Sequence, residues 1–148
     1  MTTTVADQIF VDTNVLIFAH LGSSAFHRVA LQRLHEAEAS GATLYISRQV
    51  IREFLAVMTR PPNAAQISRA DVLTDVRHLS RRFAMLEDGP RVTARLLDLA
   101  EQYMVSGRPV HDANIVATML AHDVRRLLTH NVGDFARFAS LIDVSPLT

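Results

Sequence analysis

The chain contains no cysteine and no lysine; all 15 residues of the Lys and Arg class are arginines. Without cysteine there can be no disulfide, no thiolate nucleophile and no cysteine-ligated zinc or iron–sulfur site. Without lysine the chain cannot be a P-loop enzyme, a pyridoxal Schiff-base enzyme or a phosphotransferase that needs a catalytic lysine. These absences exclude several large enzyme classes before any motif is considered.

An excess of charge and a long apolar run are also missing. The 15 basic residues balance 15 acidic ones, so no global field attracts a polyanion, and any nucleic-acid contact must come from a local patch or a bound metal. No apolar run approaches the roughly 18 uncharged residues of a membrane span. The first residues, MTTTVADQ, lack the basic flank and apolar stretch of a secretion signal, so we expect a cytoplasmic protein.

The 148 residues, of which 49% are hydrophobic and 20% charged, predict a single globular domain over 1–148. Short apolar runs alternate with longer segments of helical periodicity. The predicted strands are 8–11, 43–47, 83–87, 126–130 and 141–144. The predicted helices are 24–39, 48–60, 69–81, 90–106 and 111–122. This alternation predicts an α/β fold with three layers, a mostly parallel central sheet flanked by helices.

Four acidic residues fall at informative places in this pattern. Asp12 and Asp134 follow predicted strands, at the edge of a parallel sheet where open α/β folds bind ligands. Glu53 and Asp112 lie on predicted helices beside the apolar stripe, where a carboxylate needs a partner. The sequence therefore directs all four carboxylates toward the interior or the binding edge of the fold.

Each acid also has a structural reading on its own. Asp12 can cap a following helix, and Asp112 can be an acid favoured by the amino terminus of its helix. Asp134 can belong to a turn beside Gly133, and Glu53 can be a core acid bonded to a hydroxyl.

Together the four acids would repel one another unless a cation neutralised them. Hard oxygen ligands without cysteine or paired histidine select Mg²⁺ or Mn²⁺. We therefore predict that Asp12, Glu53, Asp112 and Asp134 form a catalytic metal site. Thr13, Asn14 and Asn131 are predicted to support it, and Arg48 and Arg52 are candidates to face the phosphate groups of a substrate near the metal. His130 is either a substrate contact or a turn residue.

Four segments carry a resemblance that covers nearly the whole chain: IFVDTNVLIFA, SRQVIREFLAVMTRP, VHDANIVATML and LLTHNVGDFARF. In their order and spacing they resemble the signature segments of PIN-domain ribonucleases, and most of all those of VapC-type toxins of bacterial toxin–antitoxin pairs. The resemblance implies an Mg²⁺- or Mn²⁺-dependent endoribonuclease that cuts RNA, is blocked by a cognate antitoxin and is commonly a homodimer. It assigns metal binding to the same four acids, places Thr13 and Asn131 at matching polar positions, and leaves His111 a structural role.

The same residues exclude two rival functions and leave a third open. A phosphatase of the haloacid-dehalogenase type needs a second acid two residues after the first and a lysine, but the chain has Asn14 there and no lysine. A response-regulator receiver is excluded by the missing lysine as well. A non-catalytic RNA- or protein-binding module on the same scaffold stays open as the alternative.

Overall fold

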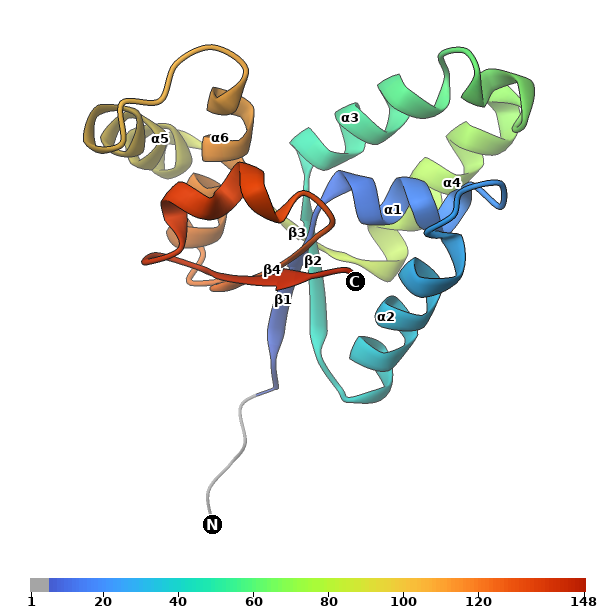
Figure 1. Ribbon diagram of the computed structural model, residues 1–148, viewed down its shortest axis with the longest axis horizontal. Coiled ribbons are helices and arrows are strands. Elements are labelled where there is room, and N and C mark those ends of the chain that lie inside the picture. Colours follow the sequence, from blue (N-terminus) through green and yellow to red (C-terminus); the bar gives the residue numbers. More distant parts are fainter. Residues whose placement is uncertain (1–5) are drawn as a thin grey trace.

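The computed structural model describes residues 6–148, which form a twisted sheet between two groups of helices (Figure 1). The strands are β1 (Gln8–Val11), β2 (Thr43–Ser47), β3 (Ala84–Leu86), β4 (Arg126–Thr129) and β5 (Asp143–Pro146). The α-helices are α1 (Thr13–His20), α2 (His27–Ala39), α3 (Arg48–Met58), α4 (Arg69–Arg82), α5 (Pro90–Gln102) and α6 (Pro109–Ala121). Two 3₁₀ segments, η1 (Asn63–Ala65) and η2 (Val132–Phe138), complete the described part of the chain.

The five strands are all parallel and lie in the order β3-β2-β1-β4-β5. The chain builds outward from β1 to β3, then crosses the sheet to β4 and continues to β5. The strand order therefore reverses between β1 and β4, and the crevice outside the carboxyl ends of these two strands is the expected binding place of such a sheet.

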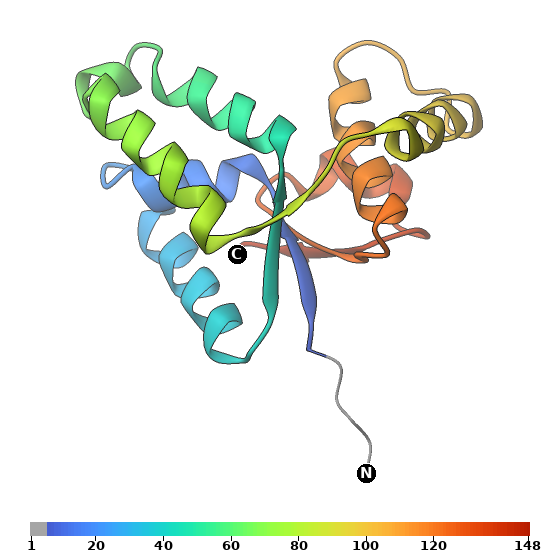
Figure 2. The ribbon, with the colours of Figure 1, turned by 180° about the vertical axis from the view of Figure 1, so that it is seen from behind.

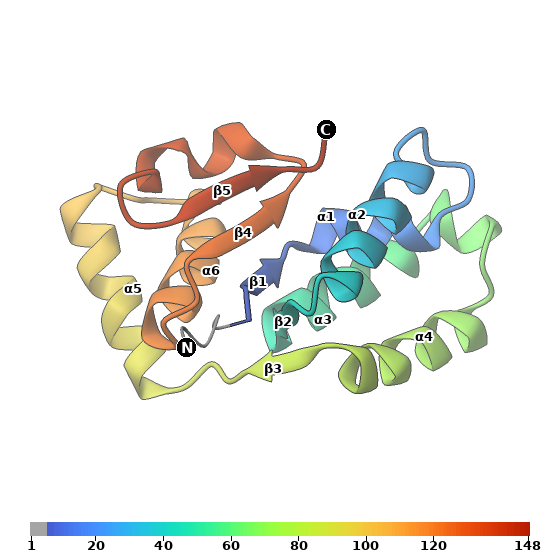
Figure 3. The same cartoon turned by 90° about the horizontal axis from the view of Figure 1, so that it is seen from below.

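The helices cover both faces of the sheet. Helices α1 to α4 gather on one side, and α5 and α6 lie on the other (Figures 1 and 3), an arrangement that Figure 2 shows from behind. Helix α6 is buried along most of its length, including Ile115 and Met119, because it lies between α5 and the rest of the molecule. A helix that is apolar nearly all round is fixed on every side by packing, so the residues at its first turn are held firmly in place.

The predicted three-layer α/β architecture is confirmed, and so are the predicted helix starts at residues 48 and 69. Each of these helices is preceded by a serine, Ser47 or Ser68, whose hydroxyl accepts a hydrogen bond from the backbone N–H of Val50 or Asp71. The fifth strand was placed two residues too early, at 141–144. Leu141 and Ile142 instead donate their N–H groups to the carbonyl of Phe138, which makes them part of the turn after η2. An apolar pattern cannot separate such a turn from the strand that follows it.

Helix α1 begins immediately after β1, with Asp12 as its N-cap.

No helix in residues 6–148 combines the length and apolar character needed to cross a membrane.

Candidate active site

Asp12 lies where the central strand becomes a helix. Val11 pairs with Leu128 of β4, and the backbone N–H of Asp12 extends that ladder by donating to the carbonyl of Leu128 over 3.0 Å. The next residues turn into α1. This change of direction places the Asp12 side chain at the crevice between β1 and β4.

Three donors hold the Asp12 carboxylate. Its Oδ1 accepts the backbone N–H of Thr13 at 2.8 Å, and its Oδ2 accepts the hydroxyl of Thr129 at 2.7 Å and the side-chain amide of Asn14 at 3.1 Å. The residue is only 6% exposed. Burial is the main reason that the pKa of Asp12 rises to about 6; the nearby Glu53 carboxylate raises it further, and the three hydrogen bonds oppose the rise.

Glu53 comes to the same place from α3. Its Oε2 accepts the Thr13 hydroxyl at 2.7 Å, and its Oε1 accepts the side-chain amide of Gln49, one helical turn earlier, at 2.9 Å. Thr13 thus binds Asp12 through its backbone and Glu53 through its side chain. The structural reading of Glu53 as an acid bonded to a hydroxyl is correct, but the hydroxyl belongs to the residue next to Asp12.

Gln49 ties α3 to α6. Its Nε2 also donates to the carbonyl of His111 at 2.8 Å, and its Oε1 accepts the side-chain amide of Asn114 at 2.8 Å. The amide of Asn114 is shared with Asp88 at 3.0 Å. Gln49 is 6% exposed, and its own contacts are at least partly buried. They set the separation between Glu53 and the first turn of α6, where Asp112 lies.

Asp112, Glu53 and Asp134 line one cleft of about 430 Å³, together with Arg108, Pro109 and His111. Partial burial is the largest cause of the rise in the pKa of Asp112 to about 6, followed by the negative charges of Asp12, Asp134 and Glu53. Those charges act on Asp112 because all four carboxylates face the same region. The structure therefore brings together acids that are up to 122 positions apart in the sequence.

The four acids converge without forming a closed ligand shell. Within residues 6–148 no group of three acidic or histidine side chains is close enough to hold a metal ion as it stands. Asp12 and Glu53 are fixed by hydrogen bonds. The Asp112 and Asp134 side chains make no hydrogen bond to another described residue, and Asp134 is exposed. Half of the cluster is thus rigid, and the other half is able to rotate.

The predicted supporting residues fall in two groups. Thr13 and Asn14 bond directly to the acids, and Asn14 also accepts the backbone N–H of His130 at 3.1 Å. The ring of His130 packs on Phe26, with the ring centroids 4.2 Å apart, which holds the loop after β4. In that loop the backbone N–H of Asn131 donates to the Thr129 hydroxyl at 3.1 Å, while the Asn131 side chain is exposed.

The two arginines predicted to face RNA do not line the acid cleft. Arg48 forms a double hydrogen bond with Glu87, both contacts at 2.7 Å, and Arg52 is exposed on α3. The cleft contains Arg108 instead, a residue outside the four signature segments of the sequence.

Sequence reasoning also missed Gln49 and Thr129. Both left a signal: Gln49 precedes Glu53 by four residues, the spacing at which helix side chains meet, and Thr129 is a hydroxyl at the end of an apolar strand. Neither signal could be interpreted without knowing that β4 lies beside β1 and that α3 faces α6.

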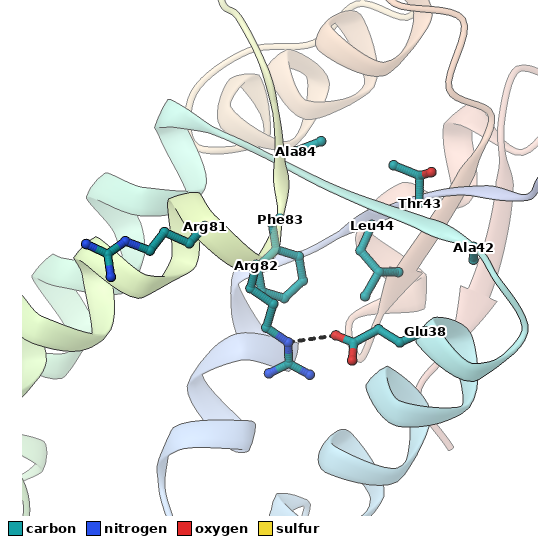
Figure 4. A pocket seen from close by; sticks show the side chains of 8 residues that line it. All are labelled: Glu38, Ala42, Thr43, Leu44, Arg81, Arg82, Phe83 and Ala84. Carbon is teal, nitrogen blue, oxygen red and sulfur yellow. Dashed lines mark hydrogen bonds and ion pairs between the residues drawn. The ribbon is translucent and has the colours of Figure 1, made fainter.

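A second and larger hollow, of about 580 Å³, lies at the opposite edge of the sheet, where β2 and β3 begin. Figure 4 shows Arg82 reaching across it to Glu38, while Arg81 points away from this pair. The Arg82–Glu38 contact is 2.7 Å, so these two charges are already paired. The hollow has one acidic lining residue, whereas the acid cleft has three.

Comparison with known proteins gives one family. The family model described as "PIN domain" matches residues 9–141. Ribonuclease VapC24 of Mycobacterium tuberculosis is 28% identical over 147 residues, which cover 93% of this chain and 96% of the relative.

Solved structures share the fold at lower identity. A toxin–antitoxin complex from Klebsiella pneumoniae contains a chain that is 24% identical with a TM-score of 0.68, covering 95% of this chain and 98% of the other. Mycobacterium tuberculosis VapC20, described as a toxin that cleaves the sarcin–ricin loop, is 20% identical with a TM-score of 0.65, covering 93% and 99%.

The Gln49 contacts predict a stability effect. Replacing Gln49 with Leu keeps the approximate volume but leaves the His111 carbonyl and one Glu53 oxygen without the Gln49 donor, and leaves the Asn114 amide with Asp88 alone. We expect the free energy of unfolding in urea to fall by about 1–3 kcal/mol. Gln32→Leu, on the exposed face of α2, is the matched control and should change it by less than about 0.5 kcal/mol. An equal effect of both substitutions would show that the link between α3 and α6 contributes nothing.

The raised pKa of Asp112 predicts a pH-dependent effect on the metal-free protein. A carboxyl whose pKa is higher in the folded than in the unfolded state lowers stability as the pH rises from about 4 to about 6, because the folded state must give up its proton at an unfavourable site. Asp112→Asn should therefore raise the melting temperature in EDTA at pH 7.5, and this gain should shrink toward pH 4. Asp98→Asn, exposed on α5, is the control and should show no gain at either pH. A melting temperature that is unchanged or lower in Asp112→Asn at pH 7.5 would contradict the repulsion.

Proposed function

The chain belongs to the PIN-domain family, and from this premise we propose that it is an endoribonuclease that depends on Mg²⁺ or Mn²⁺ and is the toxin of a toxin–antitoxin pair. The observation that carries the proposal is the convergence of Asp12, Glu53, Asp112 and Asp134 at the crevice where the strand order reverses. The named activity of the VapC24 relative, a ribonuclease, supports the reaction type. The solved toxin–antitoxin complexes of the same fold support a cognate antitoxin as partner.

The donor set fits a hard divalent cation. All four side chains offer carboxylate oxygens. Burial is the largest cause of the raised pKa values of Asp12 and Asp112, and the neighbouring carboxylates add to both, so a bound cation would relieve an unfavourable site. Mg²⁺ commonly keeps several waters and uses only one or two protein carboxylates. A closed shell of three acids is therefore not required in advance, and Asp112 and Asp134 can adjust toward a cation held by the fixed pair.

The chain's own residues divide the remaining work. Asp12 and Glu53 would hold the cation, kept in register by Thr13; Asn14 and Thr129 fix the Asp12 carboxylate; Asp112 and Asp134 would complete the ligand set. A bound divalent cation polarises the phosphodiester and offsets the charge that develops on its oxygens during cleavage. No covalent nucleophile is needed from the protein. The reaction would be hydrolysis of an RNA phosphodiester bond in the cytoplasm.

The first prediction concerns cleavage. The purified chain should cut labelled RNA only when Mg²⁺ or Mn²⁺ is present, and either Asp12→Asn or Asp112→Asn should reduce the rate by about 100-fold or more, because each removes a charge that holds the cation. Cleavage is followed on a denaturing gel, and circular dichroism checks that the variants are folded. Asp98→Asn is the control and should cut at the normal rate. Cleavage that persists in EDTA or in both site variants would refute the metal site.

The second prediction separates an enzyme from a non-catalytic binding module on the same scaffold. Mg²⁺ or Mn²⁺ should raise the melting temperature, because a cation that binds the folded cluster stabilises it by mass action. A gain of about 1 kcal/mol corresponds to roughly 2–4 °C for a domain of this size. The rise should disappear in Asp12→Asn and persist in Asp98→Asn. RNA or antitoxin binding without any effect of metal on melting would favour the binding module.

Two further properties stay predictions that rest on the family. A homodimer is expected, and sedimentation in solution is the direct measurement of it. Sequencing the RNA ends that arise on brief induction of the chain in cells would identify the substrate.

A further inference from the structure

The acid cleft contains an arginine whose charge is not used. Arg108 lines the cleft with Glu53, Asp112 and Asp134. It is exposed, and its guanidinium makes no ion pair and no hydrogen bond with any residue in 6–148. The guanidinium thus shares the cleft with three carboxylates and is paired with none of them.

The backbone that carries Arg108 is well defined. Gly107 has a φ of +72°, a left-handed conformation that glycine adopts without strain, and Pro109 is the first residue of α6 with its φ fixed by the ring. The N–H of Val110 donates to the carbonyl of Gly107 at 3.0 Å, and the N–H of His111 donates to the carbonyl of Arg108 at 3.1 Å. Arg108 is therefore presented at the rim of the cleft by a rigid turn, with only its side chain free to move.

Two other arginines, one near Glu53 in sequence and one beside the second hollow, are already engaged. Arg48 is bound to Glu87, and Arg82 is bound to Glu38 across the second hollow (Figure 4). Arg108 differs from both because the carboxylates near it have another task in the proposed function. Once a cation offsets their charge, the guanidinium is the remaining positive group at the rim of the cleft.

We propose that Arg108 binds a phosphate group of the RNA backbone beside the bond that is cut, as a substrate-positioning residue. This assignment rests on the proposed function. A guanidinium presents paired N–H donors in a planar fork that matches two phosphate oxygens, and such charge-assisted contacts are about twice as strong as neutral ones. The carboxylates attract cations and repel RNA, so a positive group at the rim supplies the attraction that the formal net charge of zero does not.

The test compares Arg108→Gln with Arg77→Gln, an exposed arginine on α4 without an ion pair among the described residues. With a labelled RNA that the unsubstituted chain cuts, Arg108→Gln should raise KM about 10-fold and leave kcat within about 2-fold, because it removes an interaction with the bound substrate. Arg108→Lys should recover part of the loss, since it restores the charge but not the fork. Arg77→Gln should match the unsubstituted chain.

Binding gives a readout independent of turnover. In the Asp12→Asn background, Arg108→Gln should weaken binding of the same labelled RNA about 10-fold at low salt. It should also lower the slope of log K against log salt concentration by about 0.7, the contribution of one phosphate contact to a single strand. The rise in melting temperature with Mn²⁺ should be the same in Arg108→Gln as in the unsubstituted chain, because the metal ligands are intact.

The outcomes separate this assignment from the proposed function. Normal KM, binding and salt slope in Arg108→Gln, with metal-dependent cleavage retained, would overturn the role of Arg108 and leave the nuclease standing. Loss of the Mn²⁺ effect on melting in Arg108→Gln would overturn it as well, because the residue would then act on the metal site. If the unsubstituted chain neither binds nor cuts RNA, the proposed function fails and the assignment fails with it.

Discussion

The arrangement depends on one buried carboxylate at the centre of the sheet. Asp12 ends the central strand, and its charge is tolerated because the next backbone N–H, the Asn14 amide and the Thr129 hydroxyl all point at it. The Thr129 contact exists only because β1 and β4 are neighbours, although 114 residues separate the end of one from the start of the other along the chain. The crossover that reverses the strand order therefore creates the site. It also brings the Thr129 hydroxyl to Asp12, and this donor stabilises the buried carboxylate.

The remaining acids depend on this anchor through hydroxyl and amide contacts. Thr13 connects Asp12 to Glu53, and Gln49 connects Glu53 to the start of α6. Each link is a short hydrogen bond between groups that are at least partly buried, so displacement of one element would leave polar groups unsatisfied on the next. The four acids therefore differ in how firmly they are held: hydrogen bonds fix Asp12 and Glu53, whereas the side chains of Asp112 and Asp134 are free to rotate. In the proposed function, such a site would tighten around a cation without movement of the fold.

Much of this could be predicted from the sequence, and the reason is periodicity. The strand and helix patterns placed Asp12 and Asp134 at strand ends and Glu53 and Asp112 on inward helix faces, which is enough to predict convergence in a parallel sheet. What could not be predicted depends on contacts between elements. Gln49 and Thr129 are polar residues whose meaning comes from the neighbour across the interface, and a single sequence does not specify that neighbour. The position of β5 failed for a related reason: its apolar turn looks like a strand.

The arginines also show the difference between what the sequence predicts and what depends on contacts between elements. Arg48 and Arg52 lie close to Glu53 in sequence, but a helix does not point residues one or five positions apart in the same direction, and Arg48 turns away to Glu87. Arg108 lies four residues before Asp112, in a turn rather than in a motif, so no sequence pattern singles it out. In three dimensions this turn is the rim of the cleft. Because the protein has no net charge, its local electric field is set by single side chains. Here these are a carboxylate cluster, which we propose to bind a cation, and one guanidinium in the same cleft that pairs with none of the carboxylates.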